Sequence, residues 1–295
     1  MHVHDSTPPP SHAATALLGA VGHLDDLVVA FSGGVDSTVV LAAALRALGP
    51  SRTLAAIADS PALARQELQL ARRTAADLGA ELVVLPTDEL AVPGYRANGG
   101  DRCYFCKQTV LDTVSGLAAA RGFHNVATGT HQDDRRAGHR PGLRAARERG
   151  VLEPLAETGL TKKDVRAVAH EWGLTVADKA GMPCLASRIA VGIPVTRERL
   201  ALVERAEASV RDHLTTAGHG AAHDLRVRLL PVQFRVEVDR TTYEWLTGHP
   251  SVEAALLASV GKIVRLEKGC VAPYASGSVS TTVALGHLTD GRTAG

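Results

Sequence analysis

The sequence has little that would direct it to a membrane, to secretion or to a polyanion. Its 295 residues contain no apolar run near the roughly 18 residues that a membrane-spanning helix needs. The opening stretch MHVHDSTPPPSHAA lacks both a basic start and an apolar core, so we expect no signal peptide. The 32 basic residues balance 31 acidic ones, and the net charge of +1 gives no general attraction to nucleic acid or anionic lipid.

Cysteine is scarce as well, with four residues in the whole chain. Without a secretory signal, so few cysteines favour a reducing cytoplasm, where they serve metals or chemistry more often than disulfides. The remaining composition is that of a globular protein, with 45% hydrophobic and 21% charged residues. We therefore expect a cytoplasmic enzyme without a nucleic-acid or membrane partner.

Strands and helices are expected to alternate through the first part of the chain. Apolar runs predict strands at 26–32, 53–58, 81–85 and 124–128, with helical patterns over 63–79 and 106–120. Farther on, Thr161–Asp164 forms a capping box for a helix that should end at Gly173. This alternation predicts an α/β fold with a doubly wound parallel sheet, whose ligand lies beyond the carboxyl ends of the strands.

The pattern changes after about residue 180. A long helix over 197–217 precedes two paired strands, DLRVRLL and QFRVEVD, a helix from about Thr241 and a strand at 262–267. These elements predict a second, smaller α+β domain. We divide the chain into a disordered tail (1–14), a nucleotide-binding domain (15–185), an α+β domain for substrate binding or oligomerisation (186–278) and a flexible tail (279–295).

The stretch FSGGVDS, residues 31–37, lies between the first strand and its helix, where a phosphate site is expected. Its two glycines allow a sharp turn that presents bare N–H groups, the serine hydroxyls can donate to phosphate oxygens, and Asp36 can hold a magnesium ion. It is no Walker A loop, because the motif has no lysine for a γ-phosphate. An isolated Gly-Gly is more often an ordinary strand-to-helix turn. The full string instead predicts an ATP site made of Ser32, Gly33, Gly34, Val35, Asp36 and Ser37.

SGGVDS resembles the signature of the PP-loop ATP pyrophosphatases, which have the adenine nucleotide alpha hydrolase-like fold. The resemblance implies that ATP is cut between the α and β phosphates, that pyrophosphate leaves from the loop, and that AMP is transferred to a substrate oxygen. Asp36 would act in this step. The nucleophile of the second half-reaction stays open at this point.

The cysteines are the candidates for that second chemistry. Cys103 and Cys106 form a C-x-x-C pair at the start of a predicted helix, and Cys184 follows in PCLASR. Spacing alone leaves open a structural zinc site, buried thiols, a redox pair, or three ligands of an iron–sulfur cluster with one iron open. The 13 histidines show no metal-ligand spacing.

Four motifs together resemble the LarE family of ATP-dependent sulfur transferases, which act in the biosynthesis of the nickel-pincer nucleotide cofactor. They are ADSPALARQEL, DRCYFCK, RPGLRAARERGVLEPLAETGLTKKDVR and PCLASRI, and the similarity runs from about Asp26 to Ser278. The resemblance implies that a carboxylate of pyridinium-3,5-biscarboxylic acid mononucleotide is adenylated and then converted to a thiocarboxylate. It also implies a homo-oligomer and contacts with other nickel-pincer biosynthesis proteins.

The family uses two sulfur sources, and this chain resembles one of them. Some members carry a single cysteine at the PCLASR position and give up its sulfur. Others also carry the C-x-x-C and hold a [4Fe-4S] cluster whose open iron carries a labile sulfide. With Cys103, Cys106 and Cys184, this chain resembles the second kind. The implied cofactors are thus ATP, Mg²⁺ at Asp36 and a [4Fe-4S] cluster at the three cysteines, while Cys270 matches no motif and is expected to be a buried structural thiol.

An arginine pair is the candidate for binding the nucleotide substrate. Arg226 and Arg228 fall on one face of a predicted strand, which by pattern alone is typical of the wet face of an antiparallel sheet. The resemblance implies instead a phosphate clamp, for which guanidinium groups are suited. It also implies that Ser187, Arg188 and Glu207 line the same pocket, although Glu207 alone is typical of a surface helix.

The chain departs from the family around the fourth strand, where it reads TGTHQDD. Thr128 and His131 replace other polar residues there, and Asp133 and Asp134 are expected to be a magnesium ligand or a loop anchor. Two alternatives to the LarE reading stay open. One is a tRNA-thiolating PP-loop enzyme, against which the +1 charge balance weighs. The other is a nucleotide-binding module with a structural zinc.

Overall fold

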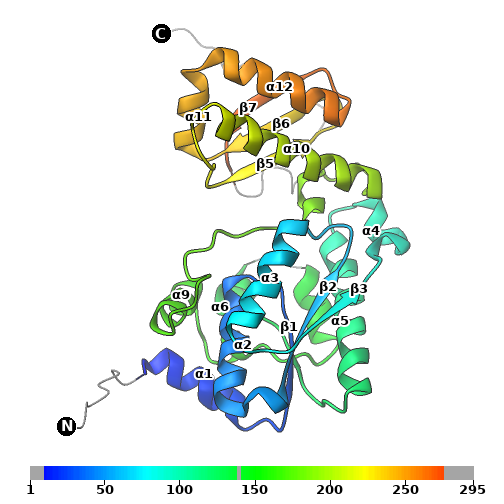
Figure 1. Cartoon of the computed structure of the whole chain (residues 1–295). Coiled ribbons are helices and arrows are strands. Elements are labelled where there is room, and N and C mark those ends of the chain that lie inside the picture. The colour runs from blue at the N-terminus through cyan, green and yellow to red at the C-terminus, as the bar shows by residue number, and fades with distance from the viewer. Residues whose placement is uncertain (1–9, 138–140, 276–295) are drawn as a thin grey trace, which may run out of the picture. The chain divides into compact units, whose positions relative to one another are not determined.

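The computed structural model describes residues 10–137 and 141–275, which divide into two compact units (Figure 1). The first unit runs to Arg96 and continues from Asp101 to Cys184, and the second holds Ala97–Gly100 and the chain from Leu185 onward. Each unit has its own sheet and its own core. The expected tail at 279–295 lies outside the described residues.

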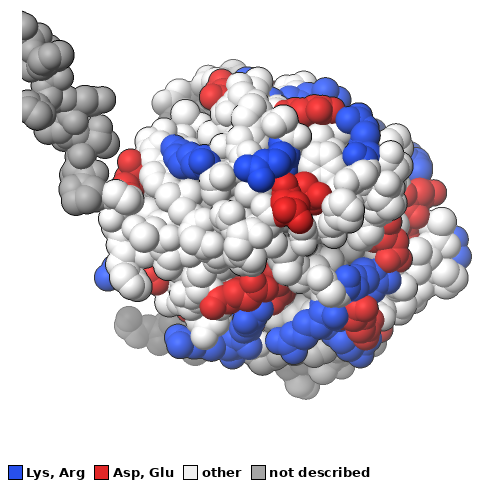
Figure 2. All heavy atoms as spheres, turned by 90° about the horizontal axis from the view of Figure 1, so that it is seen from below, with Lys and Arg blue, Asp and Glu red and all other residues white. Residues whose placement is uncertain are grey.

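The surface carries both signs of charge. On the face seen in Figure 2, Lys and Arg side chains lie beside Asp and Glu side chains instead of forming a field of one sign. Within residues 10–137 and 141–275, no helix combines the length and the apolar character that a bilayer crossing requires.

The first unit is built on a four-stranded parallel sheet in the order β3-β2-β1-β4. Its strands are β1 (Leu27–Ala30), β2 (Thr53–Asp59), β3 (Leu82–Pro86) and β4 (Val126–Ala127). All three strand pairs are parallel, which confirms the predicted doubly wound sheet. Since β2 and β3 extend the sheet on one side of β1 and β4 on the other, the strand order reverses at β1. Ligands of such sheets bind at this point, beyond the carboxyl ends of the strands.

Nine helices and two short 3₁₀ turns of the described chain accompany this sheet. They are α1 (His12–Gly22), α2 (Val35–Leu48), η1 (Pro50–Arg52), α3 (Arg65–Asp77), η2 (Glu89–Ala91), α4 (Pro93–Ala97), α5 (Arg102–Ala120), α6 (Gln132–Arg136), α7 (Pro141–Arg147), α8 (Pro154–Glu157) and α9 (Lys162–Glu171). The first helix begins inside the stretch 1–14 that was expected to be a tail. The capping box at Thr161 and Asp164 is present at the start of α9, as predicted.

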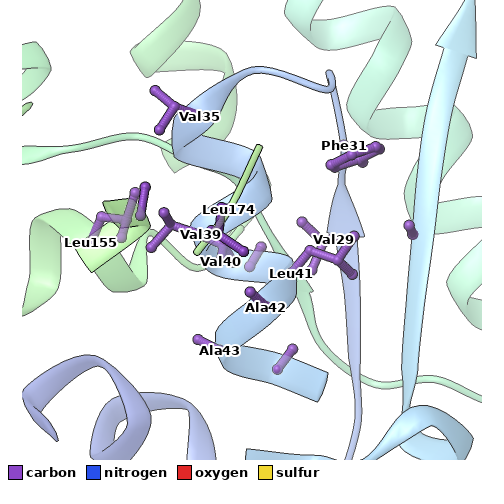
Figure 3. Packing of buried hydrophobic residues seen from close by; sticks show 14 of the residues in the cluster. Val29, Phe31, Val35, Val39, Val40, Leu41, Ala42, Ala43, Leu155 and Leu174 are labelled. Atoms are coloured by element: carbon purple, nitrogen blue, oxygen red, sulfur yellow. The ribbon is translucent and has the colours of Figure 1, made fainter. Parts of the chain in front are cut away.

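Strand β1 is buried on both faces because successive side chains of a strand point in opposite directions. Val29 packs with Val39 and Val40 of α2 in the main core cluster (Figure 3). Val28, one residue earlier, packs with Val114 of α5 on the other face. Covered in this way, β1 holds the turn that follows it in a fixed position.

The second unit has a three-stranded sheet in the order β5-β6-β7. Strands β5 (Leu225–Leu229) and β6 (Phe234–Val238) are antiparallel, and β7 (Gly269–Pro273) pairs parallel with β6. The helical elements are η3 (Leu185–Arg188), α10 (Arg197–Thr216), α11 (Arg240–Thr247) and α12 (Pro250–Val264). The predicted smaller α+β fold is therefore present.

Two expectations for this unit were wrong. The strand expected at 262–267 does not form, because α12 continues to Val264 and buries Val260 and Val264 one helical turn apart. The helix ends at Arg265, which adopts a left-handed φ of 59°, and the strand starts only at Gly269. Cys270, expected to be buried, is exposed on β7, which lies at the edge of its sheet.

Asp26 fixes the start of β4. Its carboxylate accepts hydrogen bonds from the backbone N–H groups of His124 (2.7 Å) and Asn125 (3.1 Å) and from Nδ1 of His124 (2.7 Å). Burial alone would raise the pKa of Asp26, but these hydrogen bonds outweigh it and lower that pKa. The bond to Asp26 raises the pKa of the exposed His124 ring.

We expect His124 to make the stability of the fold depend on pH. Because its pKa is higher in the folded chain, it stabilises the fold below its unfolded pKa of about 6.5, and this contribution is lost as pH rises through the folded pKa. Urea unfolding should show the wild type more stable than His124→Gln at about pH 5.5, with the difference gone by about pH 9. In an Asp26→Ala background the same substitution should have no pH-dependent effect. A difference that stays constant over this range contradicts the assignment.

Candidate functional site

The turn FSGGVDS connects the carboxyl end of β1 to the start of α2, at the point where the strand order reverses. Gly33 has a left-handed φ of 69°, and a Cβ built on it would lie 2.8 Å from the Cβ of Ala71 in α3. A side chain at this position is therefore excluded both by backbone conformation and by the close approach of α3. The glycine lets the chain reverse directly against the neighbouring helix.

Hydrogen bonds within the turn hold it in shape. The hydroxyls of Ser32 and Ser37 share a bond of 3.1 Å, the N–H of Ser32 donates to Oγ of Ser37 (3.2 Å), and the hydroxyl of Thr38 donates to the carbonyl of Gly34 (2.8 Å). Gly34 is the N-cap of α2 and supplies no side chain to the first N–H groups of that helix. Such N–H groups, at the positive end of the helix dipole, suit an anion such as a phosphate.

The loop after β4 lies directly against this turn. A Cβ built on Gly129 would lie 2.6 Å from the backbone nitrogen of Ser37 and 3.0 Å from the Cβ of Asp36. The loops that follow β1 and β4 thus meet backbone to backbone. Thr128 and Thr130 on this loop are buried and share a hydroxyl–hydroxyl hydrogen bond of 3.0 Å.

Two lysines reach the turn from distant parts of the sequence. Nζ of Lys162 lies 2.7 Å from both carboxylate oxygens of Asp36. Nζ of Lys179 donates to the carbonyl of Gly33 (3.0 Å) and to Oε2 of Glu67 (2.7 Å). The prediction that the motif itself has no lysine for a phosphate is correct, but sequence reasoning missed that the fold supplies two. The only local sequence signal near either lysine was the capping box of Thr161 and Asp164, which places Lys162 at the start of α9.

Asp133 and Asp134 anchor the loop beside these lysines. Oδ2 of Asp133 accepts the N–H of Lys162 at 2.7 Å, and Oδ2 of Asp134 accepts the N–H of His131 at 3.3 Å. Of the two roles expected for this pair, the contacts are those of a loop anchor. Asp36 then remains as the carboxylate of the turn itself. One carboxylate suffices for a magnesium ion that also binds nucleotide phosphates.

The three motif cysteines come together in the first unit. Cys103 and Cys106 lie in the first turns of α5, and Cys184 is the last residue of the unit. Burial raises the pKa of the Cys106 thiol, and the nearby Cys184 thiol, the Glu89 carboxyl and the Cys103 thiol raise it further. Cys184 is thus close enough to Cys106 for their charges to interact, although the two are far apart in sequence. No disulfide joins any cysteine within the described ranges.

The assignment of these three thiols to an iron–sulfur cluster stays a prediction. No group of three or more Cys, His, Asp or Glu side chains in residues 10–137 and 141–275 is arranged to hold one ion. In a [4Fe-4S] cluster each thiolate binds a different iron, so the ligands stand farther apart than those of one ion. Because burial raises the pKa of the Cys106 thiol, a cationic centre would be needed to stabilise its thiolate.

Lys107 is a further charged residue near these thiols that sequence reasoning missed. Burial lowers its pKa, while the negative charges of Cys106, Glu153 and Asp134 oppose that shift. It follows Cys106 directly on α5. The ammonium group of Lys107 is thus near both Cys106 and the carboxylates of Glu153 and Asp134.

Four of the five residues expected to bind substrate are joined by hydrogen bonds in the second unit, and the charges of two of them act on the fifth, Arg226. Nε of Arg188 donates to Oε1 of Glu207 at 2.8 Å, and Nη1 of Arg188 donates to the hydroxyl of Ser187 at 3.1 Å. Nη1 of Arg228 donates to the carbonyl of Ser187 at 2.9 Å. Burial lowers the pKa of Arg226, and the nearby charge of Arg188 lowers it further. Their roles in binding stay predictions.

The surface interpretations of this region were wrong. Arg226 is 1% exposed and Arg228 is 5% exposed, because both faces of β5 are covered and the pair does not lie on a wet face. Glu207 is 2% exposed and not a surface residue of α10. Glu237, which sequence reasoning did not single out for binding, accepts Nε of Arg228 at 2.9 Å and Nε of Arg235 at 3.0 Å. Buried arginines and carboxylates therefore pair with one another in this unit.

Comparisons with known proteins agree with this geometry. The NAD synthase family model matches residues 20–93, which include the SGGVDS turn. An uncharacterised protein of Synechocystis sp. is 43% identical over 190 residues, covering 64% of this chain and 70% of that protein. Pyridinium-3,5-bisthiocarboxylic acid mononucleotide synthase of Lactiplantibacillus plantarum is 35% identical over 195 residues, covering 66% and 70%. The glutamine-hydrolysing GMP synthase of Mycobacterium tuberculosis is 29% identical over 291 residues, covering 82% of this chain and 50% of that protein.

The parallel sheet with SGGVDS at its switch point defines a nucleotide-binding enzyme of the PP-loop class. Within that class, the chain belongs to the LarE family.

Proposed function

We propose that this chain is an ATP-dependent sulfur transferase that converts a carboxylate of pyridinium-3,5-biscarboxylic acid mononucleotide to a thiocarboxylate. The observation that carries the proposal is that one compact unit holds both the SGGVDS turn and all three cysteines. Within it, Cys184 is close enough to Cys106 to raise the pKa of that thiol. The similarity to the synthase of Lactiplantibacillus plantarum, whose name gives the bisthiocarboxylic acid mononucleotide as its product, supports the substrate class.

The first half-reaction is adenylation. A carboxylate oxygen of the substrate attacks the α-phosphorus of ATP, the bond to the β-phosphate oxygen breaks, and pyrophosphate leaves with the electron pair. The N–H groups at the start of α2 and the hydroxyls of Ser32 and Ser37 hold the leaving phosphates. Lys162 and Lys179 lie at the turn and neutralise the charge that develops on pyrophosphate. A magnesium ion held by Asp36 would supply further positive charge to the phosphate oxygens.

The second half-reaction replaces AMP by sulfur. Cys103, Cys106 and Cys184 would hold a [4Fe-4S] cluster, which supplies inorganic sulfur as the nucleophile toward the acyl-adenylate. The chain's own contribution is to fix the three thiols at the start of α5 and at the end of the unit. Lys107 places a positive charge beside them, where it can attract the anionic acyl-adenylate.

The second unit would bind the nucleotide substrate. Arg226 and Arg228 are buried basic side chains on the same strand, and guanidinium groups of this kind suit the phosphate of the substrate. Arg188, Glu207 and Ser187 hold that part of the network in place through the contacts described above. A guanidinium that is already desolvated loses no further hydration when it meets the phosphate.

Anaerobic reconstitution tests the proposal. We expect about four irons and matching acid-labile sulfide per chain, together with pyrophosphate release from ATP that requires the pyridinium substrate. Cys106→Ser and Cys184→Ser should lose the iron. Cys270→Ser is the matched control, because Cys270 is an exposed thiol of the second unit, and it should keep the iron.

Three results would contradict the proposal. Zinc without iron, together with ATP binding without turnover, indicates a nucleotide-binding module. Salt-sensitive binding of tRNA with thiolation of the RNA indicates a tRNA-modifying enzyme. Pyrophosphate release driven by ammonia and another carboxylic acid indicates an amidating enzyme.

A further inference from the structure

Two buried polar groups near the cysteines lack hydrogen-bond partners within the described part of the chain. They are the hydroxyl of Tyr95 and Oε2 of Glu89. Both residues are 1% exposed. A buried polar atom without a partner destabilises the fold, and the large majority of buried side-chain polar atoms in proteins are hydrogen-bonded. These two atoms are therefore available to a partner outside the polypeptide.

Both groups lie against the start of α5, where Cys103 and Cys106 are. Glu89 belongs to η2, which contacts α5. Tyr95 belongs to α4, and its neighbour Gly94 lies so close to Phe105 of α5 that a Cβ at position 94 would collide with the ring. Phe105 immediately precedes Cys106. The contacts of η2 and α4 with α5 thus bring the two groups toward the thiols.

The electrostatic interactions agree with this placement. After burial, Cys184 and Cys106 are the largest causes that raise the pKa of Tyr95, and the Glu89 carboxyl acts on Cys106 and Tyr95 alike. The four groups therefore lie near one another in the first unit.

A hydrogen bond from a neighbouring residue orients the carboxyl of Glu89. Its Oε1 accepts the hydroxyl of Thr87 at 3.0 Å, and Oε2 has no hydrogen-bond partner within the described residues. Tyr95 is large and almost fully buried, so packing alone would be served as well by phenylalanine. One group is thus a hydrogen-bond donor and the other an acceptor. A hydrosulfide ion matches this pair, because its sulfur accepts a bond and its S–H donates one.

We propose that Tyr95 and Glu89 form a binding site for hydrosulfide beside Cys103, Cys106 and Cys184, with the Tyr95 hydroxyl donating to the sulfur and Glu89 Oε2 accepting its S–H. This inference rests on the proposed function, since it assigns the sulfide that the enzyme transfers to a position next to the three thiols. Tyr95 and Glu89 act as positioning residues. They hold the sulfur and do not take part in bond breaking.

The test separates the bare protein from the loaded one. In the metal-free protein, Tyr95→Phe should leave the melting temperature unchanged or raise it, because the substitution removes only an unpaired buried hydroxyl. After anaerobic reconstitution and addition of sodium sulfide, acid-labile sulfide is followed through repeated gel filtration. Tyr95→Phe and Glu89→Gln should each lose the added sulfide about tenfold faster than the wild type, since each lacks a hydrogen bond to a charged group.

Tyr104→Phe is the contrasting control. Its hydroxyl already donates to Oε2 of Glu148 at 2.6 Å, so this variant should lose some thermal stability and retain sulfide like the wild type. Metal-free protein treated with sodium sulfide alone should retain none, which assigns the bound sulfide to the loaded site.

The outcomes distinguish the two proposals. If the wild type takes up no iron, the proposed function fails. If the wild type loads normally and both variants retain sulfide as it does, the hydrosulfide site is refuted and the proposed function stands. A large fall in melting temperature of metal-free Tyr95→Phe also contradicts the site, because it shows that the hydroxyl already has a structural partner.

Discussion

Asp36→Asn and Lys162→Met should each slow pyrophosphate release by about 10²–10³-fold, the loss typical of removing one fixed charged group from a transition state. In the bare protein, Nζ of Lys162 bridges both oxygens of Asp36 at 2.7 Å. When ATP and magnesium bind, we expect the carboxylate to turn to the metal and the ammonium group to the phosphates. Both partners then act on the same leaving group.

Lys163→Met provides the matched control. Lys163 is the next residue on α9 and is exposed, so its loss should change the rate less than about twofold. The double variant of Asp36 and Lys162 should be no slower than the worse single variant, because residues that act as one unit are not additive. Additive losses, or equal losses for Lys162→Met and Lys163→Met, would show that Lys162 has no special place at the phosphates. A quenched-flow assay of pyrophosphate measures these rates.

Glu207→Gln should destabilise the second unit by about 3–5 kcal/mol, the effect of leaving a buried charge without its partner. The side chains of Arg188 and Glu207 are 1% and 3% exposed, and Nε of Arg188 lies 2.8 Å from the carboxylate. Oε1 of Glu207 also accepts the N–H of Val227 at 3.1 Å, so the acid joins α10 to both η3 and β5. The isosteric amide keeps the shape of the side chain and removes only its charge.

Fluorescence of Trp245 can follow this unit alone. The chain has two tryptophans, so in a Trp172→Phe background the signal comes from α11 of the second unit. Glu244→Gln is the control, because its ion pair with Arg240 is between side chains that are 62% and 85% exposed and should contribute less than about 1 kcal/mol. Equal denaturation midpoints for the two glutamine variants would contradict the role given to the buried pair.

Sequence periodicity was sufficient for most of the fold and failed where a short segment suits two structures. The parallel sheet was predictable because buried strands and amphipathic helices differ in period and length. The run at 262–267 was too short to distinguish a strand from the end of a helix, and the burial of Val260 and Val264 decided for the helix. Glu207 could have been recognised as buried, since it lies one helical turn from Val203 on the apolar face of α10.

The candidate site divides in the same way. SGGVDS was readable because a phosphate turn is local: one strand end, two glycines and one helix start supply most of it. Lys162 and Lys179 were not readable, because they meet the turn from 126 and 146 residues away. The partnerless oxygens of Tyr95 and Glu89 could likewise be found only after the chain had folded, since burial and missing partners are properties of packing.

The sequence by itself determined the class of fold, the phosphate turn and the three cysteines, since each follows from residue type, spacing and local backbone geometry. Only the tertiary structure decided which charges surround that turn, that Cys184 lies near Cys106, and that the arginines of β5 are buried with their carboxylates. The physical reason is that these features depend on contacts between segments far apart in the chain, which no local pattern encodes.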